Sequence, residues 1–247
     1  MTSIAGYDIS AAPCCGKTYR TIRYRSMNFS AREYWTDGYT YGGLMPNGFG
    51  LRKCICGVFY LRREMVDLGQ VDETELENPS HVQAEDLPDA IAKARNVQVE
   101  MAARLEYWQH LNHSYRESYR AHRDAEEAAI KAAWESANPD SRNFWQKLCK
   151  VPAPTYTPPS NSPFTYPPFE PSQVQQDNMR ALLLLLNSED KRRMHLEEIV
   201  ELHRELGEFE EAAKALDEYE EIDRSKSSKL LAKLVKDKET APMRYRL

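Results

Sequence analysis

The sequence predicts a mainly α-helical protein that begins with a small β-rich unit. Apolar residues recur every three or four positions from about residue 87 to residue 137, as in an amphipathic helix. Similar helix-forming stretches fill most of residues 172–247. The first 66 residues instead combine aromatic and β-branched residues with glycine-containing turns, which is typical of short strands.

Composition excludes several classes of protein. The chain has 247 residues, a mean hydropathy of −0.70 and only five cysteines, too few for a disulfide-dense secreted scaffold. The longest uninterrupted apolar run, Ala181–Leu186, is too short to span a membrane. The first residues lack the basic and apolar stretches of a secretory signal. We therefore expect a cytoplasmic protein with no membrane partner.

Charge is divided unevenly along the chain. Residues 1–66 carry nine basic and four acidic residues, a net charge of +5, whereas the remainder carries −10. This asymmetry predicts either a basic binding face beside an acidic body, or two parts of the chain that dock on each other. Ordinary solvation of both parts is a third interpretation.

Changes in composition divide the chain into five parts. The predicted parts are a β-rich unit (1–66) ending in a strand over Val58–Leu61, an acidic linker (67–80), a long helical region (81–150), a proline-rich strap (151–171) and a helical C-terminal region (172–247). The C-terminal helices are expected at about 172–187, 190–206, 209–222 and 226–237, with an extended tail after residue 240.

The long helical region has clear ends. Pro88 suits a first helical turn, and Asn138-Pro139 stops the helix. An unbroken helix over residues 87–137 would be about 75 Å long, so a break near Asn112 is a plausible alternative. A further short helix is expected within residues 140–149, with Phe144, Trp145 and Leu148 on its apolar face. Cys149 is expected to be a small buried hydrophobe.

The strap contains eight prolines in 21 residues, which forbids helix and favours extended polyproline conformations. Tyr156, Phe164, Tyr166 and Phe169 lie among these prolines. The sequence leaves two interpretations open. The strap either packs its aromatic residues on neighbouring helices, or serves as a peptide ligand for an aromatic-lined groove.

Two cysteine pairs are the only candidate site for chemistry. Cys14-Cys15-Gly16 and Cys54-Ile55-Cys56-Gly57 lie on either side of a short β-rich stretch. Four thiolates suit the tetrahedral coordination of zinc, and a small β unit needs such a cross-link because its core is small. The two Cys–Gly turns resemble the knuckles of zinc-ribbon proteins, and this resemblance implies a structural Zn ion held by Cys14, Cys15, Cys54 and Cys56.

The cysteine spacing departs from the zinc-ribbon pattern Cys-x-x-Cys-Gly. One pair is adjacent and the other is Cys-x-Cys, and Ala12 occupies the place of a first ligand. Because adjacent cysteines rarely reach one metal together, a distorted site, a site with a replacement fourth ligand, a metal-free ribbon and free buried thiols all stay open. No histidine lies within residues 1–80, so any zinc is expected to be structural rather than catalytic.

No enzyme signature appears in the sequence. His110 and His113 have helical spacing, but no third metal ligand accompanies them. Phosphate-loop, dinucleotide-binding, nucleophile-elbow and His-Glu-x-x-His motifs are all absent. We therefore expect no catalytic residues and no enzyme activity.

Residues 195–216 resemble a tetratricopeptide repeat. The resemblance depends on a helix that ends at Leu206-Gly207, on Phe209 at the turn, and on small Ala212 where two helices approach closely. Only one repeat is clear, so an ordinary helical hairpin without a peptide groove is the alternative. In both interpretations Leu196, Ile199, Leu202 and Leu206 belong to the core.

Together these features predict a non-catalytic protein–protein interaction or adaptor protein with a structural zinc-ribbon-like module. The alternative is a nucleic-acid-binding regulator that uses residues 1–66, with Arg20, Arg23, Arg25 and Arg32 on phosphates and exposed aromatic residues on bases. The combination of a ribbon-like start and a repeat-like end resembles small bacterial proteins with no assigned chemistry. This resemblance implies an architecture, and it leaves the partner and the oligomeric state open.

Overall fold

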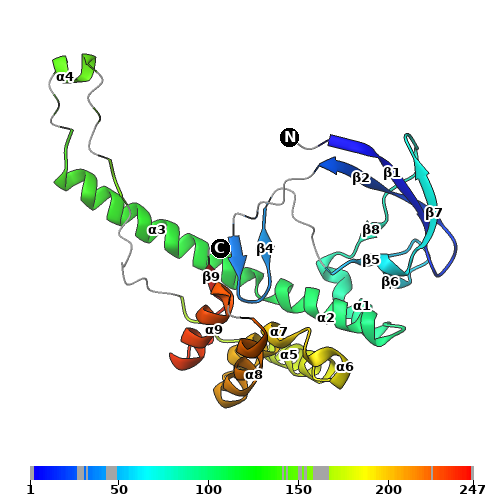
Figure 1. Cartoon of the computed structure of the whole chain (residues 1–247). Coiled ribbons are helices and arrows are strands. Elements are labelled where there is room, and N and C mark those ends of the chain that lie inside the picture. The colour runs from blue at the N-terminus through cyan, green and yellow to red at the C-terminus, as the bar shows by residue number, and fades with distance from the viewer. Residues whose placement is uncertain are drawn as a thin grey trace. The chain divides into compact units, whose positions relative to one another are not determined.

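The computed structural model describes residues 3–26, 31, 33–42, 49–140, 142, 144–149, 152, 155–157, 167–223 and 225–245. About half of the described residues are helical, and small antiparallel sheets occupy the N-terminal region (Figure 1). Contacts divide the chain into two compact units. The first unit joins residues 1–112 to residues 170–247, and the second comprises residues 113–169.

The first unit contains three small antiparallel sheets, each with one strand between two others. The central strands with their partners are β1 (Ser3–Ala11) between β2 (Thr18–Ser26) and β7 (Val66–Val71), β3 (Glu33–Trp35) between β4 (Thr40–Tyr41) and β9 (Arg244–Tyr245), and β5 (Leu51–Lys53) between β6 (Phe59–Leu61) and β8 (Ser80–His81). β6 confirms the strand expected at Val58–Leu61, and β9 lies in the extended tail.

The acidic segment 67–80 is not a simple linker. Its first five residues belong to β7, which pairs antiparallel with β1, and Ser80 begins β8. The backbone N–H and C=O groups along the second edge of β1 need partners, and β7 supplies them. All six residues of β7 are exposed, so the strand lacks the alternation of buried and exposed residues that would have indicated it in the sequence.

Two interruptions divide the long helical region. One-turn helices at Arg62–Glu64 and Ala84–Asp86 precede α1 (Leu87–Ala92), which is followed by α2 (Val97–Leu111) and, in the second unit, α3 (His113–Ala137). The break expected near Asn112 is confirmed, whereas the break at residues 93–96 was not predicted. Asn96 has an extended backbone, and its side-chain oxygen accepts a hydrogen bond from the Val99 N–H at 2.9 Å, so it caps a new helix.

The C-terminal helices follow the predicted order with one extra break. They are α5 (Gln173–Leu186), α6 (Glu189–Arg192), α7 (Leu196–Glu205), α8 (Phe209–Ile222) and α9 (Lys226–Lys236). The helix expected over 190–206 is therefore two helices. Gly207 has a φ of +75° just after α7, which confirms its predicted role at a helix C-terminus.

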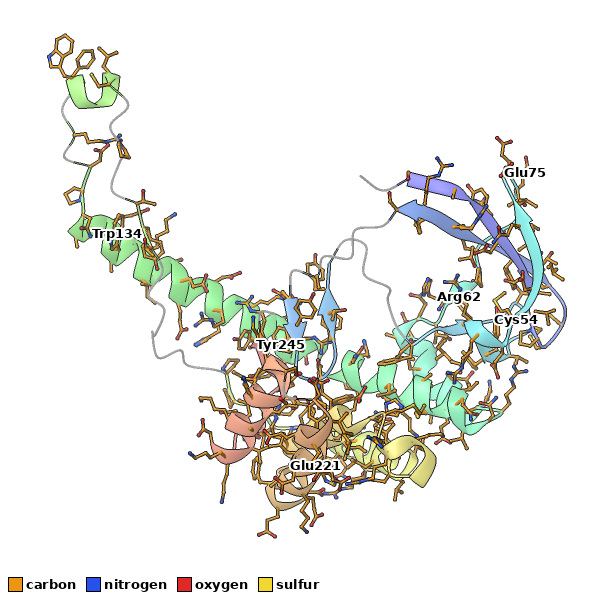
Figure 2. The ribbon with its side chains drawn as sticks, in the orientation of Figure 1. Cys54, Arg62, Glu75, Trp134, Glu221 and Tyr245 are labelled. Atoms are coloured by element: carbon orange, nitrogen blue, oxygen red, sulfur yellow. The ribbon has the colours of Figure 1, made fainter. Side chains whose placement is uncertain are left out.

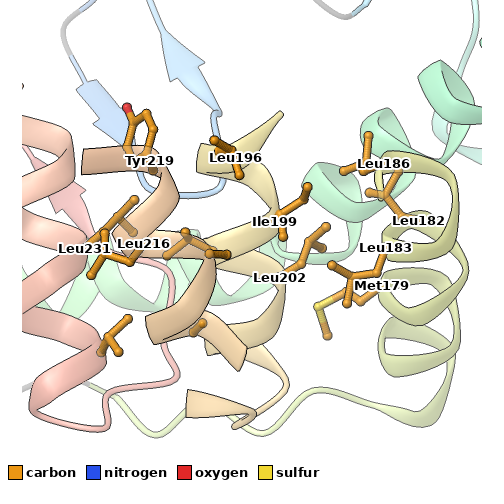
Figure 3. Close-up of a cluster of buried hydrophobic side chains, with 14 of the residues drawn as sticks. Met179, Leu182, Leu183, Leu186, Leu196, Ile199, Leu202, Leu216, Tyr219 and Leu231 are labelled. Carbon is orange, nitrogen blue, oxygen red and sulfur yellow. The ribbon is translucent and has the colours of Figure 1, made fainter. Parts of the chain in front are cut away.

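A large hydrophobic core joins α2 to these C-terminal helices (Figure 3). Its α7 residues include Leu196, Ile199 and Leu202, which confirms three of the predicted core positions, while Leu206 packs against the core and is partly buried. Ala212 is fully buried on α8, so the two helices pack closely at that residue. α7 also contributes Val200. The core members from the other helices are Leu105, Trp108, Met179, Leu182, Leu183, Leu186, Ala215, Leu216, Tyr219, Leu231 and Val235.

A second hydrophobic core attaches a sheet to the first two helices. Leu51 of β5, with Phe59 and Leu61 of β6, packs against apolar residues of α1 and α2. Near this core, the Phe49 backbone N–H donates to the Glu106 carboxylate of α2 at 2.9 Å. Side chains alternate between the two faces of a strand, so Tyr60, between Phe59 and Leu61, belongs to a different cluster.

The second unit consists of α3, α4 (Phe144–Leu148) and the described residues of the strap. Phe169 makes an edge contact with Tyr115, with 5.1 Å between ring centroids, and Tyr156 meets Trp134 at 5.7 Å. Trp134 is labelled near the end of α3 in Figure 2. Two strap aromatics therefore pack on α3, as the first strap interpretation predicts.

Other predictions for this unit have different outcomes. Phe164 and Tyr166 lie outside the described residues. Cys149 is exposed, so the prediction that it is buried is wrong. It directly follows α4, whose own apolar side chains are exposed and form no core around it. No helix in the described ranges combines the length and apolarity needed to cross a membrane.

Candidate metal centre

Two β-hairpin turns carry the four candidate cysteines. The first turn joins β1 to β2, and the Ala12 N–H closes it by donating to the Lys17 C=O at 2.8 Å. The second turn joins β5 to β6, where the Cys54 N–H donates to the Val58 C=O at 2.9 Å. Each turn ends in a glycine with positive φ, +72° at Gly16 and +85° at Gly57. An added Cβ meets no atom within 4 Å at either glycine, so backbone conformation is the reason for glycine there.

All four thiols converge between these turns. Every Sγ atom lies within 4.8 Å of the other three. Cys15 pairs with Cys54 at 3.3 Å, and Cys14 pairs with Cys56 at 3.4 Å, so each close pair joins one turn to the other. The adjacent residues Cys14 and Cys15 thus both reach the cluster, each meeting a different cysteine of the second turn.

One cysteine lies deeper than the others. Cys54 is 3% exposed and packs with Ala12, Tyr19 and Tyr60, whereas Cys15 and Cys56 face solvent. Figure 2 labels Cys54 beside β5 and β6. The Tyr19 hydroxyl lies 3.9 Å from the Cys54 sulfur. The cluster therefore has an aromatic base and an exposed rim.

The hydrogen bonds among the thiols lower the pKa of Cys54 and raise the pKa of Cys14. Burial raises the pKa of Cys54, but a hydrogen bond from the Cys56 N–H and bonds from the other three thiols outweigh burial, and the net pKa falls to about 6. Burial and the hydrogen bonds to Cys54 and Cys56 raise the pKa of Cys14 to about 12. The cluster therefore concentrates negative charge on its most buried sulfur.

The donor set fits a metal ion. A zinc ion with four sulfur ligands at about 2.3 Å requires sulfur–sulfur separations of about 3.8 Å, and the observed range of 3.3 to 4.8 Å includes that value. Backbone N–H groups two residues downstream, at Lys17 and Cys56, bond to the sulfurs of Cys15 and Cys54. Such bonds disperse the charge of coordinated thiolates. In the part of the chain that the structure describes, these cysteines form the only convergent group of potential ligands.

A second polar cluster, which the sequence did not predict, lies in the large core. Glu205 of α7 is fully buried, and its carboxyl group accepts hydrogen bonds from the Trp108 indole N–H at 2.9 Å and from the Asn112 amide at 3.1 and 3.2 Å. The same amide donates to Asp37, in the turn after β3, at 3.2 Å. Burial and the nearby charges of Glu201 and Asp37 raise the pKa of Glu205.

The same region of the core contains a buried ion pair. Arg204 ion-pairs with Glu201, and both side chains are fully buried. Asp37 and Glu205 are separated by most of the sequence, so no local motif could have indicated that they meet.

The histidine pair shows no metal site. His110 lies in the last turn of α2 and His113 begins α3, and both are exposed. Neither belongs to a convergent group of metal ligands among the described residues.

Two of the predicted phosphate-binding arginines, Arg20 and Arg25, lie beside the acidic segment 67–80. The Arg20 guanidinium donates to the Thr74 C=O and covers the Tyr7 ring, with 4.8 Å to its centroid. Arg23 donates to the Ala5 C=O at 3.0 Å. Arg25 lines a hollow together with Asp72 and Glu73. Arg32 lies outside the described residues.

Comparison with known proteins gives no match. No protein-family model matches the chain, and no curated protein or solved structure is significantly similar to it. Any statement about function must therefore come from the site itself.

Proposed function

We propose that this chain is a non-catalytic interaction protein organised around a structural zinc centre. The observation that carries the proposal is the convergence of four thiols from two hairpin turns within 4.8 Å. A tetrahedral ion uses all four sulfurs, which leaves no open position for substrate or water, as in structural rather than catalytic zinc sites. Cys14, Cys15, Cys54 and Cys56 are the proposed ligands.

The arrangement supports a zinc-ribbon-like module despite the unusual spacing. In such a module each of two β-hairpins contributes two ligands, and the β1–β2 and β5–β6 hairpins each do so here. The sheets are only three strands wide and their core beside the cysteines is small. An ion that joins both turns supplies the cross-link that so small a unit needs.

Metal analysis tests the zinc centre directly. We expect about one zinc per chain in the purified protein, and intense thiolate-to-metal absorption when cobalt replaces zinc. Cys54→Ser should abolish both signals because it removes the most buried ligand. Cys149→Ser is the matched control, since Cys149 is exposed and lies in the second unit. Less than about 0.2 metal per chain after reconstitution of the full protein would refute the zinc centre.

The helical part of the first unit supports the interaction role. The α7–α8 hairpin and its neighbours form a packed helical array, as a tetratricopeptide-like interpretation expects. A hollow of about 450 Å³ lies between α1, α2 and α5. Ile91, Tyr107 and Val174 provide apolar surface in it, while Arg104 and Asp177 provide charge. Such a mixed groove suits a short peptide segment of a partner protein.

Affinity purification of the tagged full-length protein tests this role. We expect a stoichiometric protein partner with the wild type and a several-fold loss with Val174→Glu, which places a charge in the groove. Leu184→Glu is the matched control on the same helix, because Leu184 is 80% exposed and does not line the groove. Recovery of no stoichiometric partner, or equal loss in both variants, would contradict the proposal.

Nucleic-acid binding by residues 1–66 has weaker support. Phosphates would have to compete with the acidic segment for Arg25, and Arg20 and Arg23 already bond to backbone carbonyls. Nucleic acid binding through arginines weakens steeply as salt rises. A steep salt dependence of binding by the zinc-loaded protein, lost in an Arg20→Gln/Arg23→Gln variant, would favour this alternative over the adaptor.

A further inference from the structure

Three large apolar side chains are exposed together on α4. Phe144, Trp145 and Leu148 are 73%, 69% and 61% exposed, and the Phe144 and Trp145 rings contact each other edge to face at 5.8 Å. Positions three and four apart share one face of a helix, so the three side chains form a single patch. We call these three residues the α4 patch. Nothing in the proposed zinc or adaptor role uses it.

The second unit presents this patch beyond the end of α3. α3 has 25 residues and is about 37 Å long, and α4 follows it after a short connection (Figure 1). The strap then returns to α3, where Tyr156 packs on Trp134 and Phe169 packs on Tyr115. Within this unit, the α4 patch therefore lies in the segment that connects α3 to the strap, and the strap packs against α3.

Residues 140–150, which include the α4 patch, carry three basic residues and one acidic residue, a net charge of +2. Residues 141–169 contain Arg142, Lys147 and Lys150 and no acidic residue. Arg142 is paired with Asp140, with nitrogen–oxygen distances of 2.8 and 2.9 Å. Lys147 and Lys150 both follow the exposed aromatic residues in sequence and leave the segment positively charged.

We propose that the α4 patch inserts into the interface of an anionic phospholipid surface. Tryptophan and phenylalanine lie favourably at the boundary between headgroups and acyl chains, and lysine beside them is attracted to anionic headgroups. A second copy of the chain is a poorer occupant because two like-charged segments would repel each other. A peripheral contact of this kind needs no membrane-spanning helix, so the absence of a long apolar run does not oppose it.

Vesicle sedimentation with the full-length, zinc-loaded protein tests the proposal. We expect binding to phosphatidylcholine–phosphatidylserine vesicles, about tenfold weaker binding to pure phosphatidylcholine vesicles, and weaker binding at high salt. Phe144→Ala/Trp145→Ala should lower binding at least tenfold. The matched control is Leu184→Ala/Met194→Ala, which removes two side chains that are equally exposed, 80% and 73%, in the first unit. An unchanged melting temperature for both double variants shows that the fold is retained.

Fluorescence locates the contact. Trp35 and Trp108 are buried, and Trp134 packs against the strap. A blue shift on addition of anionic vesicles should therefore come from Trp145. Trp145→Phe keeps an aromatic side chain, so it should still bind the vesicles but should lose the blue shift.

Three results would overturn the proposal. The first is an absence of preference for anionic vesicles, and the second is vesicle binding by Phe144→Ala/Trp145→Ala that equals wild-type binding. The third is a wild-type dimer in sedimentation velocity that this double variant converts to monomer. That result would assign the patch to a second copy of the chain.

Discussion

Replacement of Glu205 separates two contributions of the buried polar cluster to stability. Its carboxyl group is the shared acceptor for the Trp108 indole and the Asn112 amide, and the residue is only 1% exposed. Glu205→Ala removes the acceptor for both donors. Glu205→Gln keeps an acceptor of nearly the same shape and removes only the ability to ionise.

The expected loss for Glu205→Ala follows from the two buried donors. The Trp108 N–H and one N–H of the Asn112 amide lose their acceptor, while the same amide keeps its bond to Asp37. Each buried N–H left without a partner costs about 1–3 kcal/mol, so the free energy of unfolding should fall by about 2–6 kcal/mol. A typical domain is stable by only about 5–15 kcal/mol, so this loss should be plain in a urea titration. Glu205→Gln should remain within about 1 kcal/mol of the wild type at low pH, where the wild-type carboxyl is protonated.

The pH dependence has a definite sign. Burial, with the charges of Glu201 and Asp37, raises the folded-state pKa of Glu205 above the usual value of 4.5, while Arg204 and the Trp108 hydrogen bond act in the opposite direction. Between the unfolded and folded pKa values the folded state binds more protons, so stability falls as pH rises through the folded pKa. A glutamine amide cannot titrate, so Glu205→Gln should become progressively more stable than the wild type as pH increases.

Urea unfolding of both proteins at matched pH values, from about pH 5 to 9, measures this difference. Comparison at each pH cancels the titration of groups that do not interact with Glu205, including the cysteines. Parallel stability curves for the wild type and Glu205→Gln would refute a raised pKa. A loss of less than about 0.5 kcal/mol for Glu205→Ala would refute the assigned hydrogen bonds.

Three further substitutions test other parts of the first unit by the same urea assay. Leu202→Ala should cost about 2–5 kcal/mol because Leu202 is fully buried in the large core, while Leu184→Ala should change stability by less than about 0.5 kcal/mol. Gly207→Ala should cost about 1–2 kcal/mol because φ is +75° there, and an equal cost at an ordinary helical position would contradict the assigned turn. Asn96→Ala should cost about 1–2 kcal/mol through loss of the α2 cap and of the bond to Glu64, and Asn96→Asp should restore the cap contribution.

Local patterns explain why much of the helical region was predictable. The spacing of Leu196, Ile199 and Leu202 indicates one buried helix face, and Gly207 indicates a helix end. Both features can therefore be predicted from neighbouring residues in the sequence. The break before α2 was missed because Asn96 looks like an ordinary polar helix residue until its capping bond to Val99 is seen. β7 was missed because its pairing with β1 joins residues that are distant in the sequence.

Residue type identified the four cysteines that converge, but it did not indicate which of them lie closest together. Four cysteines beside glycines identify the two turns, because positive φ at Gly16 and Gly57 is a local requirement. The adjacency of Cys14 and Cys15 argued against a shared metal. Their different partners, Cys56 and Cys54, depend on how two separate hairpins face each other, and spacing within one hairpin contains no information about that.

Side chains of β6 alternate between the two faces of the strand, so β6 contacts both the cluster beside the proposed metal centre and the helices α1 and α2. Phe59 and Leu61 face α1 and α2, while Tyr60 faces the cluster that contains Cys54 and Tyr19. One three-residue strand therefore contributes to two cores at once, and a displacement of β6 toward either core disturbs the other. An ion bound between the turns would fix the β5–β6 hairpin from one face. The metal would then stabilise the surface against which α1 and α2 pack, and so would contribute to the helical array as well as to the sheets.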